Sequence, residues 1–408
     1  MDALTIIYFV YMFVSIYILS LFLVSFFRIK KELYDTPKIT KEYGVSVLIP
    51  AHNEEGSIGG TVRAVSKLKY NNIKEILVID DGSTDKTLAI ARSLQKKIPM
   101  LKVFTKKNGG KADALNYGLK KAAGELVVVV DADSFPRQDA LQKTVGYFDD
   151  KTVGVVTIPI LVRNSHNLLS RLQRIEYSTI ALTRKLLEPI DAIYVTPGPF
   201  AVYRKSALVD VGGFDTKNIT EDIEITWNLA SRGYSRRMNL DTEVTSIAPD
   251  KFRAWWHQRN RWTIGGFQTM FKYKHFLFKE NILGYFILPF FAVGFALGLF
   301  GMGIFTYLMW QKFLAEYLFV KFSFMANTAL VTGTDITNFT PTVLNYFGIV
   351  LFFMMFLFTI FVLLIMDKEL FKGKGFLDIV LYMVFYLLLA PLILITATFK
   401  LIKRDMKW

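Results

Sequence analysis

The hydrophobic pattern divides the chain into apolar ends and a mixed middle. Residues 4–27 are almost continuously apolar and carry no charged side chain, and a helix of this length crosses a hydrocarbon layer about 30 Å thick. Further apolar runs follow at residues 281–310, 313–331, 342–366 and 376–399. The pattern predicts a multi-pass membrane protein with an N-terminal span at residues 1–30 and three or four C-terminal spans at residues 281–408.

Basic residues predict how these spans are oriented. Arg28, Lys30 and Lys31 follow the first apolar run instead of preceding it, which differs from a cleaved signal peptide. By the positive-inside rule, the segment after this run is expected in the cytoplasm. Residues 313–331 form a doubtful span because two charges lie inside them. Three C-terminal crossings would leave the basic tail at residues 400–407 outside, and four would bring it inside, so the charge rule favours four.

In the middle of the chain, residues 43–250, short β-branched runs alternate with helical periodicity. Strands are expected at residues 45–50, 75–80, 101–105, 125–130 and 153–158, and helices at residues 57–68, 85–97 and 111–123. This alternation predicts an α/β fold with a mostly parallel, Rossmann-like sheet covered on both faces. Such sheets bind ligands beyond the carboxyl ends of their strands, so the polar residues there are the candidate site.

Composition narrows the possible chemistry. The formal net charge of +14 fits nucleic acid, a polyanionic substrate or the anionic cytoplasmic leaflet of a bilayer. The apolar runs favour the leaflet, and no nucleic-acid partner is expected. Because the chain contains no cysteine, disulfides, thiolate metal sites and cysteine nucleophiles are excluded.

Two carboxylates, Asp131 and Asp133, directly follow the strand expected at residues 125–130. Carboxylates at this spacing can converge on one hard cation, and Mg²⁺ is held by one or two carboxylates plus substrate phosphates. Such a cation neutralises the charge that develops on a diphosphate leaving group. The alternative is that both acids only end the strand and cap the next turn, since a pair at this spacing is common by chance.

Two further motifs lie at the same predicted edge of the sheet. In the acidic run at residues 80–85, Asp80 or Asp81 can bind a uracil or a ribose hydroxyl, or the run can be only a turn and a helix cap. At residues 108–116, glycines and Lys111 stand at a predicted helix start, where backbone N–H groups favour phosphate. The P-loop spacing is missing, and a solvent-facing lysine is the alternative.

Glu221 and Asp222 open a helix that is expected to run to about Arg232, with Thr220 at its N-cap position. Asp222 is a candidate base for the proton of an attacking sugar hydroxyl, and a positioned base contributes roughly 10²–10⁴-fold in rate. The helix dipole alone also favours acids in a first turn, which is the alternative explanation.

Residues 251–280 combine aromatic and basic side chains and are expected to form a helix at the membrane interface. Within them, Arg261 can pair with a diphosphate through its planar guanidinium, and Trp262 can stack on a sugar ring. Membrane anchoring alone is the alternative. Residues 167–190 are a second candidate for an interface helix, with core packing as the alternative.

The motifs Asp80-Asp81-Gly82, Asp131-Ala132-Asp133, Thr220-Glu221-Asp222 and Gln258-Arg259-Asn260-Arg261-Trp262, in this order, resemble those of processive family 2 glycosyltransferases. The resemblance covers about residues 45–266. Residues 110–116, 174–177 and 198–204 make the chain most similar to the poly-β-1,6-N-acetylglucosamine and chitin-oligosaccharide synthases of this family. The resemblance implies a GT-A fold, an inverting transfer from a UDP-sugar such as UDP-N-acetylglucosamine, and a Mg²⁺ or Mn²⁺ cofactor.

The resemblance also implies a role for each matching residue. It assigns the base to Asp222, the metal to Asp133, donor contacts to Asp80, Asp81, Lys111, Asp131, Asp133 and Arg261, and acceptor contacts to Glu221, Gln258, Arg259 and Trp262. It further implies a plasma-membrane protein with a cytoplasmic catalytic domain and a polymer channel through the membrane helices. The implied partners are a growing glycan or lipid acceptor, membrane lipid and a small accessory membrane subunit.

Two other functions stay open. One is a non-processive transferase that glycosylates a polyprenyl or dolichyl phosphate or another lipid, although such enzymes usually lack the Gln-Arg-x-Arg-Trp segment. The other is a nucleotide-binding membrane channel or scaffold. Intact acidic residues at all four strand-end or helix-start sites argue against that second alternative.

Overall fold

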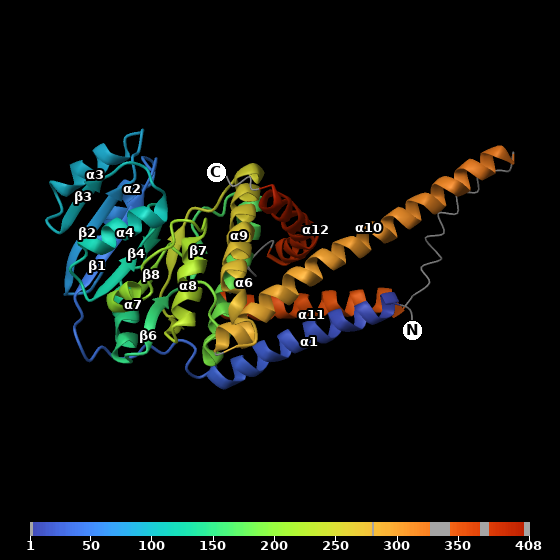
Figure 1. Cartoon of the computed structure of the whole chain (residues 1–408), viewed down its shortest axis with the longest axis horizontal. Helices are drawn as coiled ribbons and strands as arrows, with labels where there is room; N and C mark the ends of the chain where they lie inside the picture. The colour runs from blue at the N-terminus through green and yellow to red at the C-terminus, as the bar shows by residue number, and fades with distance from the viewer. Residues whose placement is uncertain (1–2, 280, 327–342, 368–374, 404–408) are drawn as a thin grey trace.

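The computed structural model describes residues 3–279, 281–326, 343–367 and 375–403. Figure 1 shows an elongated molecule with a sheet domain at one end and long apolar helices extending from the other. Two helices, α6 (Leu168–Leu186) and α9 (Phe252–Tyr273), lie between these two parts. The expected α/β fold flanked by apolar helices is confirmed.

The central sheet has seven strands in the order β3-β2-β1-β4-β8-β6-β9. Their bounds are β1 Val45–Ala51, β2 Ile73–Asp80, β3 Leu101–Thr105, β4 Leu126–Val129, β6 Val153–Thr157, β8 Ala201–Arg204 and β9 Ser235–Met238. Strands β3, β2, β1 and β4 are parallel, and β8 is antiparallel to both of its neighbours. The sheet is therefore mostly parallel, as expected.

Strand β1 shows that the sheet is covered on both faces. Val47 and Ile49 belong to a core cluster with α2 (Ile58–Val65), whereas Leu48 belongs to a second cluster with α4 (Lys111–Lys121) and α8 (Glu221–Ser231). Every residue of β1 is buried, as is typical of parallel strands between two helical layers. The helix α3 (Thr87–Gln95) packs against α2 and β3.

A small second sheet stabilises the turn after β4. It has the order β5-β10-β7, formed by β5 Ser134–Pro136, β7 Ile160–Val162 and β10 Val244–Ser246. Because β5 begins directly after Asp133, its pairing with β10 fixes the backbone that carries the two carboxylates. The short helices α5 (Ala140–Thr144) and α7 (Lys205–Asp210) complete the domain.

All five strands and three helices expected from the pattern are present, with ends that agree or differ by at most three residues. The sequence reasoning missed β5, β7, β8, β9 and β10. These strands have three or four residues each, too few for a clear alternation. Strand β8 runs antiparallel to its neighbours. The strand–helix alternation that predicts parallel strands therefore does not predict the second half of the sheet.

Four described helices are long and apolar enough to cross a membrane: Thr5–Ile29, Leu283–Met325, Gly348–Met366 and Gly375–Ile402. They belong to α1 (Ala3–Ile29), α10 (Leu288–Met325, with a π-helical turn Leu283–Ile287 before it), α11 (Val343–Met366) and α12 (Gly375–Ile402). The charge rule favours a separate span at residues 313–331, but the described part of this segment belongs to the single helix Leu283–Met325. No helix-breaking residue separates Trp310 from Phe313, so α10 continues to Met325; residues 327–331 lie outside the described part.

The apolar helices pack on one another through aromatic side chains. Phe22 of α1 stacks on Phe358 of α11 with ring centroids 5.6 Å apart, and Phe26 meets Phe361 edge-on at 4.8 Å. On the outer side of α1, Phe13 is 71% exposed. Large exposed apolar side chains on helices of this length are what a lipid environment accommodates.

Candidate active site

A cavity of about 390 Å³ lies beyond the carboxyl end of β4, between the sheet domain and α6, α8, α9 and the beginning of α10. Most of the residues predicted for the site line it, namely Lys111, Asp131, Asp133, Glu221, Asp222, Gln258, Arg261 and Trp262. The other three predicted residues, Asp80, Asp81 and Arg259, are outside its lining in the described part of the chain. Motifs far apart in sequence therefore meet around one space.

Lys111 lies at the centre of the charged wall. It is the first residue of α4, and its Nζ is 2.6 Å from Asp131 Oδ1 and 2.7 Å from Glu221 Oε1. Burial disfavours its charge, but Asp131, Glu221 and Asp222 raise the pKa of Lys111 above its ordinary value. Lys111 therefore stays protonated and joins the acids of two distant motifs, which excludes the solvent-facing alternative.

Two glycines allow this arrangement. Gly110, just before α4, has a φ of 87°, a conformation that favours glycine. At Gly198, an added Cβ would overlap with Lys111 Nζ and lie 2.9 Å from each carboxylate oxygen of Asp131. Any larger side chain at Gly198 would displace the Lys111–Asp131 pair.

Asp133 is the carboxyl group best suited to a cation. Its Oδ1 accepts a hydrogen bond from Ser134 Oγ at 3.1 Å. Burial and the negative charges of Asp131 and Glu54 raise the pKa of Asp133 to about 6. The described residues contain no group of three or more histidine or acidic side chains that could hold a metal, but Mg²⁺ needs only one or two protein carboxylates when substrate phosphates supply other ligands. The donor set fits such an ion, because a cation would relieve the repulsion at Asp133.

Asp222 and Glu221 begin α8 and titrate differently. Burial and the charge of Glu221 raise the pKa of Asp222 to about 6. Burial also disfavours the charge of Glu221, but Lys111 and Arg261 outweigh it and lower the pKa of Glu221. Paired carboxyls whose environments separate their pKa values in this way are typical of acid–base sites.

Helix α9 supplies the opposite wall. Gln258, Arg261 and Trp262 are three and four residues apart, so they share the helix face toward the cavity. One turn later, an added Cβ on Gly265 would overlap with Thr220 Oγ1 at the N-terminus of α8. Because Gly265 lacks this atom, the backbone of α9 packs directly on α8 and brings Arg261 close to Glu221 and Asp222.

Arg259 is directed away from the cavity. Its Nε donates to Glu176 Oε1 on α6 at 3.1 Å, its Nη2 also contacts Glu176, and both residues are less than 9% exposed. The guanidinium lies 4.2 Å from the centroid of the Trp262 ring. The structure therefore favours a positioning role for Arg259, which joins α9 to α6 and supports Trp262, and acceptor contact by Arg259 stays a prediction.

Asp80 and Asp81 are buried beneath the loop that leads to Lys111. Asp81 accepts hydrogen bonds from the backbone N–H groups of Gly109 at 3.0 Å and Gly110 at 2.7 Å. Asp80 accepts a hydrogen bond from Thr105 Oγ1 at 2.7 Å. These bonds hold the glycine-rich loop in place, and direct donor contact by either aspartate remains a prediction.

One cavity residue, Arg184, escaped the sequence reasoning. Tyr177, Ile180, Ala181 and Arg184 form one face of α6 that lines the cavity. Arg184 is 5% exposed, its Nε has no hydrogen-bond partner in the described structure, and burial lowers the pKa of its guanidinium. A basic residue in a last helical turn is ordinary, so the sequence gives no signal for Arg184.

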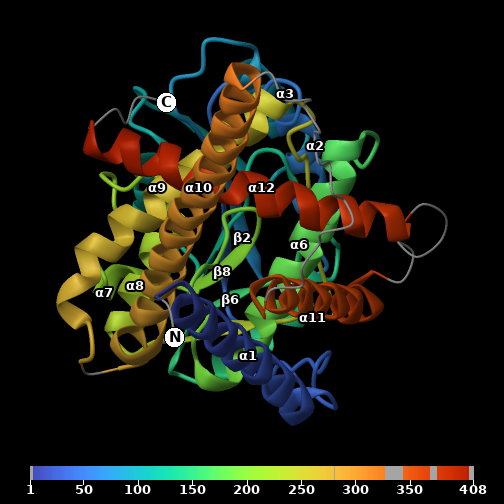
Figure 2. The same cartoon turned by 90° about the vertical axis from the view of Figure 1, so that its right-hand side faces the viewer.

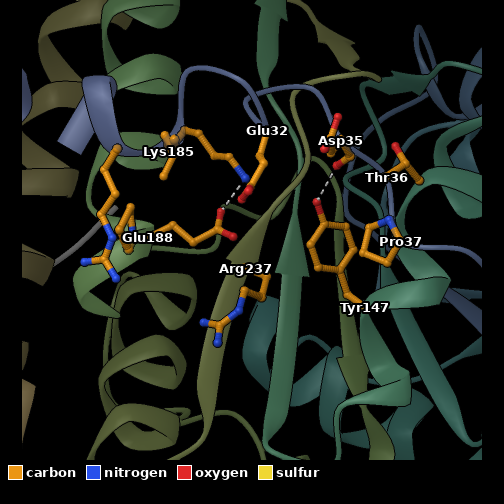
Figure 3. Close-up of a pocket in the computed structure, with 11 residues that line it drawn as sticks. Glu32, Asp35, Thr36, Pro37, Tyr147, Lys185, Glu188 and Arg237 are labelled. Carbon is orange, nitrogen blue, oxygen red and sulfur yellow. Dashed lines mark hydrogen bonds and ion pairs between the residues drawn. The ribbon is translucent and has the colours of Figure 1, made fainter.

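A second cavity of about 560 Å³ lies on another side of the domain, where the segment after α1 crosses it (Figure 3). It contains none of the predicted site residues. Lys185 Nζ is 2.8 Å from Glu188 Oε2, and Tyr147 donates to the carbonyl oxygen of Asp35 at 3.2 Å. Because its basic and acidic side chains are balanced in number, we assign it no ligand.

Comparison with known proteins agrees with this geometry. A profile described as glycosyl transferase family 2 matches residues 46–212. The poly-beta-1,6-N-acetyl-D-glucosamine synthase of Staphylococcus epidermidis is 30% identical over 328 residues, which cover 78% of this chain and 79% of that protein. The chain belongs to glycosyl transferase family 2. Within this family, the Staphylococcus aureus enzymes of the same name are 35% identical over 231 residues, so the match spans only 56% of their length.

A solved structure shares the fold of this chain. The mannosyltransferase from Pyrobaculum calidifontis, whose structure contains GDP-Man and Mn²⁺, superposes with a TM-score of 0.56 over 89% of this chain and 99% of its own. At 22% identity, this likeness shows a shared fold. The expected resemblance to family 2 glycosyltransferases is confirmed.

Proposed function

We propose that this chain is a membrane-embedded inverting glycosyltransferase that uses UDP-N-acetylglucosamine and extends a β-linked polysaccharide. One observation carries the proposal: Lys111, Asp222 and Arg261, from three separate motifs, line a single cavity. The kinship with poly-beta-1,6-N-acetyl-D-glucosamine synthases supports the choice of sugar and of a polymeric product. We further propose that residues 43–250 are the cytoplasmic transferase domain, residues 251–280 an interface region, and the protein a component of the plasma membrane.

In this proposal, Asp222 removes the proton from the acceptor hydroxyl as the hydroxyl attacks the anomeric carbon. The attack breaks the bond to the diphosphate in one displacement, so the configuration inverts without a covalent enzyme intermediate. A pKa of about 6 leaves Asp222 ionised but still basic at neutral pH. Trp262, supported by Arg259, provides an aromatic face for the acceptor sugar.

The donor side of the cavity balances the charge of the diphosphate. Lys111 and Arg261 supply fixed positive charge beside it, and Asp133 is the proposed ligand of Mg²⁺ or Mn²⁺. When bound, such an ion neutralises charge on the departing diphosphate. Asp131 is held by Lys111, so its carboxylate is oriented before the donor arrives. Asp80 and Asp81 fix the loop before Lys111 and are proposed to border the nucleotide.

A second candidate, transfer to a lipid phosphate, is favoured by the other end of the cavity. Phe291 and Phe295 of α10 form part of its lining there, together with the buried guanidinium of Arg184. An apolar wall beside a guanidinium for which the described residues supply no carboxylate ion pair suits a phosphate on a hydrocarbon chain. In Arg184→Gln, a lipid-phosphate transferase should lose affinity for its acceptor, whereas a polymerase should lose mainly product length.

The deciding experiment incubates purified protein with radiolabelled UDP-N-acetylglucosamine and Mg²⁺, with and without a short polyprenyl phosphate. We expect a polydisperse polymer whose size grows with time and which needs no added lipid. A product of one fixed size that extracts into organic solvent would replace the polymerase proposal with the lipid-phosphate one. Labelled donor that binds but is never transferred would leave only a nucleotide-binding channel or scaffold.

A further inference from the structure

Helix α12 is attached to the catalytic domain along its length. Near its beginning, Asp378 Oδ2 is 2.8 Å from Arg171 Nε on α6. Near its end, Thr396 Oγ1 donates to Asn260 Oδ1 on α9 at 2.8 Å. Between these two contacts, a third hydrogen bond joins the middle of α12 to α6: Tyr386 Oη donates to Glu176 Oε2 at 2.6 Å.

The spacing of these contacts is incompatible with a helix that leaves the domain and crosses the bilayer. Eighteen residues separate Asp378 from Thr396, which is about 27 Å along a helix. That length is close to the whole hydrocarbon thickness of about 30 Å. A spanning helix would contact the domain at one end only, whereas α12 contacts it at both ends.

The two views of the molecule agree with the contacts. In Figure 1, α1 and α11 run lengthwise across the picture and α12 is seen nearly end-on. In Figure 2, turned by a quarter, α12 lies across the picture in full length while α11 is foreshortened. Helix α12 therefore runs across the direction of the other apolar helices.

The end of α11, which precedes α12 in the chain, also lies on the side of the catalytic domain. Asp367, just after α11, accepts a hydrogen bond from Arg174 Nη2 of α6 at 2.7 Å. The beginning of α10 is on the same side, because Phe291 meets Trp227 of α8 edge-on at 5.5 Å. Thus α10 leaves the domain and α11 returns to it before α12 begins.

The outer face of α12 is apolar from one end to the other. Its most exposed large side chains are Phe376 at 61%, Leu387 at 66%, Phe399 at 60% and Ile402 at 72%. The face toward the domain carries the hydrogen-bonding groups and buries Ile379 and Ala397. Because the outer side chains are apolar along the whole length of the helix, this face suits contact with lipid and not with water. Helices α1 and α11 also carry exposed apolar side chains.

We infer that α12 does not span the membrane but lies in its plane, with its outer face in the lipid of the leaflet next to the catalytic domain. The chain then crosses three times, through α1, α10 and α11. This inference rests on the proposed membrane location but not on sugar transfer. It places the basic residues Lys400 and Lys403 on the side of the catalytic domain, so the positive-inside rule is met without a further span.

The absence of cysteine in the chain allows a direct test with single-cysteine variants. Ser93→Cys reports the catalytic domain, Met325→Cys the far end of α10, and Lys403→Cys the end of α12; all three positions are exposed. A membrane-impermeant maleimide applied to intact cells should label only Met325→Cys, and inverted vesicles should show the opposite pattern. Labelling of Lys403→Cys together with Met325→Cys would overturn the inference. Labelling of Ser93→Cys and Met325→Cys from one side would instead contradict the proposed membrane arrangement.

Measurements of depth in the bilayer test whether α12 crosses the membrane without any need to know which side a residue faces. A fluorophore at Leu377→Cys, Leu388→Cys or Ile402→Cys is quenched by lipids that carry a spin label at different depths. We expect all three positions to lie at one shallow depth. As a control on α11, Phe353→Cys and Leu364→Cys should differ by about 16 Å. A depth that passes through the bilayer centre between Leu377 and Ile402 would show that α12 crosses.

Discussion

The two walls of the cavity are built in different ways. On the sheet side, acidic groups come from short loops that follow strand ends or begin helices, and Lys111 joins them through direct ion pairs. On the α9 side, the functional face depends on Arg259, whose partner Glu176 lies on another helix 83 residues away in sequence. The comparison separates residues that we propose act on substrate from residues that position them, and the following changes test that division.

The largest expected effect comes from Asp222→Asn. If Asp222 is the base, transfer should fall by roughly 10²–10⁴-fold while UDP binding, measured calorimetrically, stays near that of the parent. The raised pKa of Asp222 means that the fold disfavours its charge, so the melting temperature at pH 7 should not fall. Asp210→Asn, at an exposed position, is the control. Normal turnover by the Asp222 variant would contradict the proposal that Asp222 is the base.

Arg259→Gln and Arg261→Gln should separate positioning from contact. Removing Arg259 leaves Glu176 buried without its cation, and breaking a buried pair costs about 3–5 kcal/mol, so thermal unfolding should shift clearly downward. Arg261→Gln should lower the melting temperature less, because Lys111 still pairs with Glu221, and should raise KM for the donor. Arg92→Gln, on the outer face of α3, controls for loss of charge alone. Equal melting temperatures for the Arg259 and Arg261 variants would contradict the positioning role of Arg259.

Asp133→Asn should raise the metal concentration needed for half-maximal activity. A factor of at least about 10 to 100 is expected, because even partners outside the ligand shell affect metal affinity by that much. A titration with Mg²⁺ and one with Mn²⁺ measure it. If the metal requirement of this variant is unchanged, the ion is held elsewhere.

The pH profile gives the smallest effect. Asp222 must be ionised to accept a proton, and its pKa is raised to about 6. Activity at low donor concentration should therefore be level above this pH and fall about tenfold per unit below it. A profile that stays level down to pH 5 would contradict either the base or its environment.

The sheet side of the cavity was largely predictable. Asp131, Asp133 and Lys111 follow strand ends or begin a helix, and parallel strands bring such positions to one edge regardless of details. Arg259 and Arg261 were not distinguishable in this way. They differ by two residues on one helix, so they point in different directions, but only the position of α6 decides which of them faces the cavity.

Other features depend on packing that no local pattern records. Arg184 belongs to a basic helix end that looks solvated, yet tertiary packing buries it in the cavity wall. The reversal at β8 has no signal in its four residues. Helix α12 has the composition of a membrane span, and only its contacts with α6 and α9 show how it lies.

The direct packing of Gly265 on Thr220 limits where the enzyme can vary. With no side chain on Gly265, α9 packs closely on Thr220, so a bulkier acceptor between Asp222 and Trp262 would have to break this contact. Phe291 and Phe295 at the opposite boundary are tied to the same two helices, because they pack on Trp227 of α8 and Phe267 of α9. A change of acceptor width there would therefore require these aromatic contacts to repack as well.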